Sequence, residues 1–209
     1  MIRGAAFLLA PAALALALGC QPQPRAAMPV YGPWEEGLTL AFEDPTLSTK
    51  AQRSVDRLQV RVARSSMAPG APRLVQLDLT SLRGRISMLV RHQDGGIAIL
   101  GEDGGVVAQT LPAGFPGTTA WTDRGVQYRV VGRAAWKGAD KVLPPTSDPV
   151  GVWVEARSPQ GPRRRTLYLP NLGEVETQEE RGGSWITVNR LVARGFVDLP
   201  AAPLSDRRP

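Results

Sequence analysis

The sequence contains a single cysteine, Cys20, and a single histidine, His92. One cysteine cannot form an internal disulfide, and one residue of each type cannot complete the usual ligand set of a zinc site. No Gly-x-Ser-x-Gly motif is present, so nothing in the sequence marks a serine nucleophile for a catalytic His92. We therefore expect no catalytic residue, no metal and no cofactor, and we predict that His92 is a solvated residue at the entrance of a turn.

Lysine is also scarce, because only three of the 25 basic residues are lysines and the rest are arginines. The formal net charge is +6 at pH 7. A modest positive excess would favour anionic lipid headgroups or polyanionic envelope polymers as partners, but the interpretation we prefer is a basic soluble surface. No stripe of interleaved basic and aromatic residues is present, so we expect no nucleic-acid partner.

The longest apolar run, Ala5–Leu18, is interrupted by Pro11 and has 14 residues. A membrane-spanning helix needs about 20 apolar residues, whereas this length and the preceding Arg3 are typical of an export signal. The remaining chain has the mixed composition of a globular domain, since 43% of all residues are hydrophobic and 21% are charged.

The apolar run ends in Ala17-Leu18-Gly19-Cys20. This sequence resembles the lipobox of bacterial lipoprotein precursors. The resemblance implies cleavage between Gly19 and Cys20, a diacylglycerol group on the Cys20 thiol, and a further acyl chain such as palmitate on the new amino group. The alternative is an ordinary signal followed by a buried cysteine. Two acyl chains are enough for stable attachment to a membrane.

Four segments follow from this resemblance and from composition. Residues 1–19 are predicted to be the signal peptide, 20–33 the lipidated cysteine with a proline-rich tether, 34–200 a single β-rich domain, and 201–209 a disordered tail. The residue after the cysteine is Gln21, which in the best-studied diderm sorting system permits transfer to the outer membrane. We therefore expect the domain at the periplasmic face of the outer membrane, or at the outer face of the plasma membrane if the cell has one membrane.

Apolar residues of the domain recur with a period of two, which predicts antiparallel strands with one buried and one wet face. The alternating stretches are 38–42, 58–62, 75–79, 86–90, 126–130, 150–156 and 186–192. Turn-forming residues separate them at 94–96, 103–105, 158–162 and 181–184. We predict an all-β fold of eight to eleven mainly antiparallel strands in a curled, half-barrel or barrel-like sheet. At most one short helix is expected, within Pro45–Leu58, and residues 132–149 should form a long loop.

Two short stretches carry a weaker likeness. Leu111-Pro112-Ala113-Gly114 leads to Trp121, and the segment 167–175 precedes a hairpin through Trp185. They resemble β-rich envelope lipoproteins of unknown biochemical role, and the curled half-barrel of LolA-like lipoprotein carriers is a looser architectural analogue. This likeness implies a fold and no activity.

Two groups of residues are candidates for binding. Arg163, Arg164 and Arg165 form the densest positive cluster, and on a strand Arg163 and Arg165 would share a face while Arg164 takes the other. The cluster either contacts an anionic surface or, as we favour, forms a charged edge that prevents aggregation. Trp153 and Trp185 lie opposite the main apolar positions of their strands, where they either pack at the rim of the core or form a ligand platform.

Three hypotheses of function remain open. The first is a non-catalytic, lipid-anchored envelope protein that binds an apolar or amphipathic ligand, or an envelope partner, through its sheet. The second is an assembly lipoprotein that docks a protein complex. The third is a carboxylate-based hydrolase, which needs two carboxylates within about 5–10 Å in a cleft. The acidic pairs 35–36, 102–103 and 179–180 are adjacent in sequence, and neighbours on a strand point to opposite faces.

Overall fold

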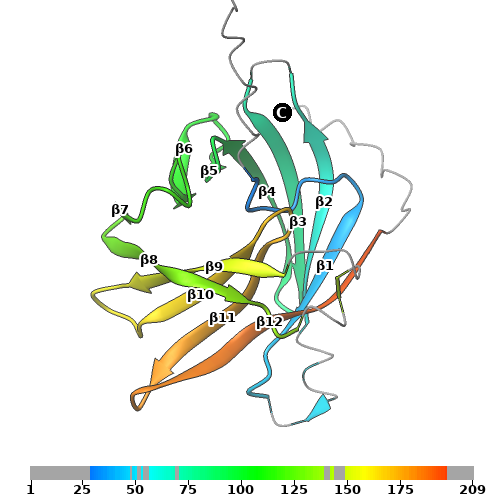
Figure 1. The fold of residues 1–209 in the computed structure, drawn as a ribbon. Coiled ribbons are helices and arrows are strands. Elements are labelled where there is room, and N and C mark those ends of the chain that lie inside the picture. The colour runs from blue at the N-terminus through cyan, green and yellow to red at the C-terminus, as the bar shows by residue number, and fades with distance from the viewer. Residues whose placement is uncertain are drawn as a thin grey trace, which may run out of the picture.

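A computed structural model describes residues 29–47, 49–50, 53, 57–68, 71–138, 142–143 and 149–196. The predicted signal peptide, Cys20 and the predicted tail lie outside the described residues. Twelve antiparallel strands form one sheet that curls into a nearly closed barrel (Figure 1). The strands are β1 (Leu38–Glu43), β2 (Leu58–Ser66), β3 (Arg73–Ser81), β4 (Gly84–Gln93), β5 (Gly96–Leu100), β6 (Val106–Leu111), β7 (Ala120–Asp123), β8 (Val126–Ala135), β9 (Val150–Arg157), β10 (Arg164–Leu169), β11 (Gly173–Arg181) and β12 (Ser184–Phe196).

The strand order is β6-β5-β4-β3-β2-β1-β12-β11-β10-β9-β8-β7. Every neighbouring pair is therefore consecutive in the chain, except that β1 pairs with β12 in the middle of the sheet. The two end strands, β6 and β7, are joined by residues 112–119. Phe115 of this connection is fully buried, and its ring lies 4.8 Å from that of Tyr31 and 6.3 Å from those of Trp121 and Tyr168. Aromatic packing thus closes the barrel at the point where the strands do not pair.

Three hairpins turn through two residues that both have positive φ. These pairs are Asp94-Gly95, Arg124-Gly125 and Gly182-Gly183, with φ between 45° and 79°. Positive φ at both central residues defines the type I′ turn, whose twist matches that of the flanking strands. The turns predicted around 94–96 and 181–184 are confirmed, while the Arg124-Gly125 turn was not among the predicted ones.

The seven alternating stretches are confirmed as β1, β2, β3, β4, β8, β9 and β12, and the all-β, barrel-like fold is confirmed with them. The predicted number of strands was too low. β11 shows why, because its sequence GEVETQEER has almost no apolar alternation and its polar side chains bond to neighbouring strands instead. β8 also continues to Ala135, so the predicted loop from 132 is shorter at its start.

The helix predicted within Pro45–Leu58 lies partly outside the described residues. Lys50 and Arg53 are helical, and the Arg53 amide donates a hydrogen bond of 3.1 Å to the Thr49 carbonyl, but residues 48, 51–52 and 54–56 lie outside the described part. Within the ranges that the structure describes, no helix has the length and hydrophobicity needed to cross a bilayer.

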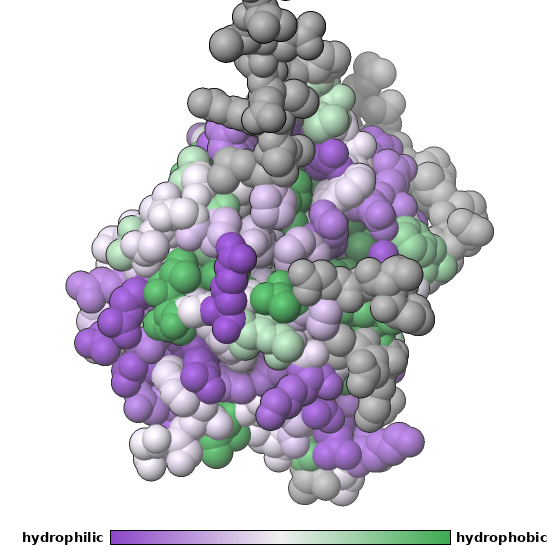
Figure 2. Space-filling model, viewed as in Figure 1, coloured by the Kyte–Doolittle hydropathy of each residue, from purple (hydrophilic) through white to green (hydrophobic). Residues whose placement is uncertain are grey.

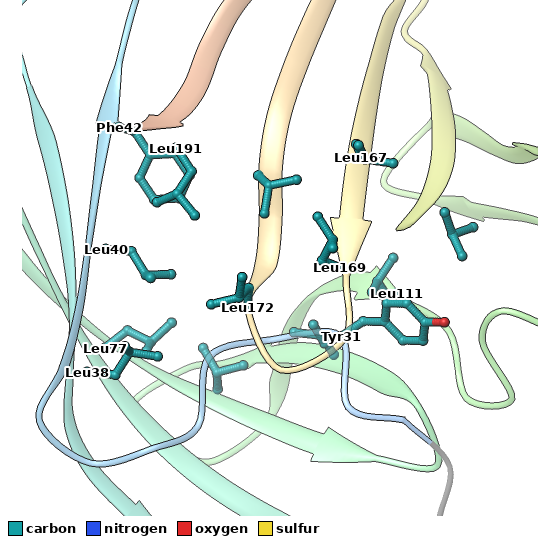
Figure 3. Close-up of a cluster of buried hydrophobic side chains, with 14 of the residues drawn as sticks. Tyr31, Leu38, Leu40, Phe42, Leu77, Leu111, Leu167, Leu169, Leu172 and Leu191 are labelled. Carbon is teal, nitrogen blue, oxygen red and sulfur yellow. The ribbon is translucent and has the colours of Figure 1, made fainter. Parts of the chain in front are cut away.

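The chain enters the domain at Tyr31, three residues before the predicted boundary. Tyr31 is only 4% exposed and belongs to the core cluster, where it lies beside Leu111 and Leu169 (Figure 3). The backbone N–H of Asn171 donates a hydrogen bond of 2.6 Å to the Val30 carbonyl. The domain begins earlier than predicted because the Tyr31 ring is buried. Packing an aromatic side chain in the core removes a large apolar surface from water. We refer to residues 30–34 as the strap.

Replacement of Gly32, in the strap, should destabilise the fold. A Cβ at this position would lie 2.6 Å from Cε1 of the buried His92 and 3.1 Å from Cδ1 of Ile97. We expect Gly32→Ala to lower the free energy of unfolding by about 1–3 kcal/mol, because overpacking a rigid site forces its neighbours to move. Urea unfolding followed by tryptophan fluorescence measures this change.

Gly195→Ala in β12 is the matched control, because a Cβ there meets nothing within 4 Å. Its unfolding midpoint should stay close to that of the unaltered chain. Equal stability of Gly32→Ala and the unaltered chain would show that the strap is not packed against His92 as described.

Candidate functional site

Five strands, β8 to β12, place polar and aromatic side chains on one face. Cross-strand partners in an antiparallel pair share a face. Their registers connect a single row across the sheet, which consists of Arg129, Glu155, Arg165, Gln178 and Thr187. Trp153 and Glu176 lie in the next row on the same face, since both are linked through Leu167. We call this surface the tryptophan–arginine face.

The guanidinium of Arg165 lies between the two candidate tryptophans. Its Cζ is 4.9 Å from the ring centroid of Trp153 and 4.5 Å from that of Trp185, and Cζ of Arg163 is 5.5 Å from Trp185. Distances below about 6 Å allow cation–π attraction. The structure therefore brings together Trp153, Trp185, Arg163 and Arg165, which the sequence had suggested separately.

Hydrogen bonds hold these arginines in place. Nη2 and Nη1 of Arg163 each donate at 2.9 Å, to Glu155 and Glu180 respectively, and Nε of Arg165 donates at 2.7 Å to Gln178. The hydrogen bond to Glu155 is the main reason that the pKa of Arg163 is raised. Burial lowers the pKa of Arg165, because the charged form loses hydration between the rings. Both side chains are thus oriented before any ligand arrives.

A groove with a cavity volume of about 460 Å³ opens beside this stack, between β7, β8 and β9. Its charged lining consists of Arg129, Arg157 and Glu155, and the stacked pair Trp121 and Tyr128 also lines it, with ring centroids 5.1 Å apart. Arg129 and Arg157 each approach the Glu155 carboxylate only to 3.8 Å, while Arg163 bonds to it at 2.9 Å. Three guanidinium groups therefore share one carboxylate.

The charge balance of this groove is positive. Glu155 is buried, with 10% of its side chain exposed, whereas the side chains of Arg129 and Arg157 are 64% and 60% exposed. Figure 2 shows hydrophilic side chains gathered on the left and lower parts of the surface, over the β8–β12 half of the sheet. An anion in the groove would meet two guanidinium groups that share the Glu155 carboxylate with Arg163, which favours its binding.

A second groove, of about 350 Å³, lies where residues 136–142 approach β11 and β12. Its lining includes Glu176, Thr187, Arg190, Trp136 and Lys137. Glu176 accepts hydrogen bonds from Gln178 and from Thr187, the latter at 3.0 Å. Thr187 belongs to the row defined above, so both grooves lie along the same face.

The preferred interpretation of the arginine cluster as a sheet edge was wrong. β10 pairs with β9 on one side and with β11 on the other, so Arg164 and Arg165 lie in the interior of the sheet. Arg164 does take the opposite face, where it bonds to Glu179 at 2.6 Å. A hydrogen bond from Arg181 is the largest of the effects that hold the pKa of Glu179 below its usual value. The end strands of the sheet are β6 and β7. The sequence could not show that β10 is an interior strand, because edge and interior strands share the same alternation.

The prediction of a solvated His92 was also wrong. β4 extends to Gln93, so His92 continues the buried face of Val90 and is 5% exposed. It faces Arg73 on β3 and Ile97 on β5, and its ring contacts Gly32 of the strap. Nδ1 has no hydrogen-bond partner among the described residues. Burial, with a smaller effect of the Arg73 charge, lowers the pKa of His92 to about 4.

The free energy of unfolding should therefore decrease as the pH is lowered from about 6.5 to about 4, the two pKa values of His92 in the unfolded and the folded chain. The folded chain keeps the imidazole neutral down to about pH 4, whereas the unfolded chain binds a proton below the ordinary pKa of 6.5. Since the unfolded state binds more protons between these values, the free energy of unfolding is expected to drop by about 3 kcal/mol from pH 7 to pH 4. Urea titrations at several pH values measure this drop.

His92→Gln serves as the control, because it removes the titrating group and leaves the other charges in place. The difference between the two unfolding curves isolates His92 from carboxylates that also titrate near pH 4. Identical pH profiles for both chains would contradict a buried, neutral His92.

Glu155, Glu179 and Glu180 are engaged with arginines, whereas Glu174 and Glu176 accept hydrogen bonds from neutral side chains. Glu155 and Glu180 converge on opposite sides of the Arg163 guanidinium, and Glu179 is held by Arg164 and Arg181. The guanidinium between Glu155 and Glu180 makes them a charge network, in contrast to the acid and base of a hydrolase. Within the described part of the chain, no group of three or more His, Cys, Asp and Glu residues is arranged to hold a metal ion.

Comparisons with known proteins give two likenesses in structure. One is a protein from Bacteroides fragilis, predicted to be exported and described as having a YmcC-like fold, with 12% identity and a TM-score of 0.48. The other is a predicted lipoprotein from Parabacteroides distasonis, with 13% identity and a TM-score of 0.44. Each comparison covers 80% of this chain and 99% of the other. No protein-family model and no curated protein matches the sequence significantly. TM-scores below 0.5 support no statement about function.

Proposed function

We propose that this chain is a non-catalytic, lipid-anchored protein of the cell envelope that binds an anionic amphipathic ligand at the tryptophan–arginine face. The observation that carries the proposal is the sharing of the Glu155 carboxylate by Arg129, Arg157 and Arg163 beside a groove of about 460 Å³. The lipid anchor is proposed from the lipobox-like sequence that ends at Cys20.

The character of the grooves determines the kind of ligand. The core residues pack into one cluster, and the two grooves described above open to solvent and have charged, polar and aromatic residues in their lining. A purely apolar ligand prefers an enclosed apolar pocket. Guanidinium groups next to the Trp121–Tyr128 pair instead suit a ligand that has an acidic group and an apolar part.

Binding in the first groove can be tested with dodecyl phosphate, below its micellar concentration, as the anionic amphipath. Arg129→Gln combined with Arg157→Gln should weaken binding at least about tenfold, because each lost hydrogen bond to a charged group contributes about 1.5–3 kcal/mol. Isothermal titration calorimetry on the chain from residue 20 onward, with Cys20→Ser, gives the affinities. All residues of the buried core lie between Tyr31 and Leu191, within that chain.

Arg64→Gln combined with Arg83→Gln is the matched control, because it removes the same charge from exposed positions on the other half of the sheet. Dodecyl maltoside, with the same tail and no charge, should bind much more weakly than the phosphate. Equal loss of affinity in the two double variants would argue against a specific site in the groove.

Anchoring at Cys20 is testable in bacterial cells. We expect the unaltered chain to incorporate radioactive palmitate and to sediment with membranes, whereas Cys20→Ser should do neither, since both acyl chains depend on this residue. Adding Ser66→Cys to Cys20→Ser restores a thiol at an exposed position of β2 and should not restore labelling. An unaltered chain that remains unlabelled and water-soluble would exclude the anchor.

A further inference from the structure

Both grooves of the tryptophan–arginine face contain more positive than negative side chains, with Arg129 and Arg157 against Glu155 in the first and Lys137 and Arg190 against Glu176 in the second. In the first groove, Arg129 and Arg157 share a carboxylate that is already bonded to Arg163. In the second, Lys137 and Arg190 are exposed, and neither forms an ion pair with any residue that the structure describes. A small anion would use only one of these places.

The row of cross-strand partners joins the two grooves. It begins with Arg129 and Glu155 in the first groove and ends with Thr187 in the second. Neighbouring strands are about 4.8 Å apart, so the row from β8 to β12 spans about 19 Å. Arg165 lies at its centre and forms no ion pair with a described residue, while its Nε–H donates to Gln178. The row thus holds two arginines and one glutamate, and Lys137 and Arg190 line the groove at its far end.

The chemistry between the grooves favours carboxylates over sugar rings. A sugar ring stacks on an open aromatic face, but Arg165 covers Trp153 and both Arg163 and Arg165 lie over Trp185. The guanidinium fork matches the two oxygens of a carboxylate.

We infer that the ligand of this face is an extended acidic segment of a partner protein, which crosses β8 to β12 from the first groove to the second. This inference rests on the proposed binding function of the same face. An extended peptide rises about 3.3 Å per residue, so about six residues span the row. Acidic side chains at both ends of the segment would reach Arg129 and Arg157 in one groove and Lys137 and Arg190 in the other.

The test compares glutamate oligomers of three and nine residues, labelled with a fluorophore, on the chain from residue 20 onward with Cys20→Ser. The nine-residue oligomer should bind at least about tenfold more tightly than the three-residue one, because contacts in the second groove become intramolecular once the first groove is filled. Fluorescence anisotropy at constant ionic strength gives both affinities.

Variants in the second groove test whether this groove causes the tighter binding of the longer oligomer. Lys137→Gln combined with Arg190→Gln should lower the affinity of the long oligomer to nearly that of the short one and leave the short one unchanged. Arg64→Gln combined with Arg83→Gln removes the same charge elsewhere and should leave the ratio of the two affinities unchanged.

Each outcome separates this inference from the proposed function. Equal affinities for the two oligomers would overturn the extended ligand, while binding that still depends on Arg129 and Arg157 would leave the proposed function intact. Binding of dodecyl phosphate without binding of either oligomer would exclude a peptide. Tighter binding of dextran sulfate or of phosphatidylglycerol vesicles, with the same dependence on both grooves, would replace the peptide by an anionic polysaccharide or a membrane surface.

Discussion

The pairing of β1 with β12 is the contact on which the rest of the structure depends. It joins two runs of consecutive hairpins, β1–β6 and β7–β12, into one sheet, and it is the single neighbouring pair formed by strands far apart in the chain. Without it, two separate hairpin series would each leave an apolar face in water. With it, the sheet curls around one core, and the strap and Phe115 fill the places where the strands do not meet.

The burial of Glu155 gives the tryptophan–arginine face its electrostatic character. A buried carboxylate requires a close partner, and Arg163 provides it at 2.9 Å. Arg129 and Arg157 are attracted to the same group but remain 3.8 Å away, with most of their surface in water. One negative charge therefore orders three positive ones. Such prearrangement lowers the cost of binding an anion, because the arginines do not have to be gathered when it arrives.

Parts of this site were accessible from the sequence and others were not. Trp153, Trp185, Arg163 and Arg165 were selected from alternation and charge, and the structure brings them into one stack. Arg129, Arg157, Glu155 and Gln178 were not selected, because nothing in the sequence around each of them indicates its cross-strand partner. The predicted edge role of the arginine cluster and the solvated His92 failed for related reasons: strand order decided the first, and packing of the strap against β4 decided the second.

The sequence by itself determined the all-β class, seven of the twelve strands, two of the type I′ turns and the alternation that separates Arg164 from its neighbours. These features follow from backbone sterics and from periods of two residues, which are local properties of the chain. The tertiary structure alone decided the strand order, the burial of His92 and Tyr31, and the gathering of three arginines around Glu155. They depend mostly on contacts between residues far apart in the chain, such as Gly32 with His92 and Leu38 with Phe196. Which of these residues meet is set by the global pairing of strands, which no local pattern encodes.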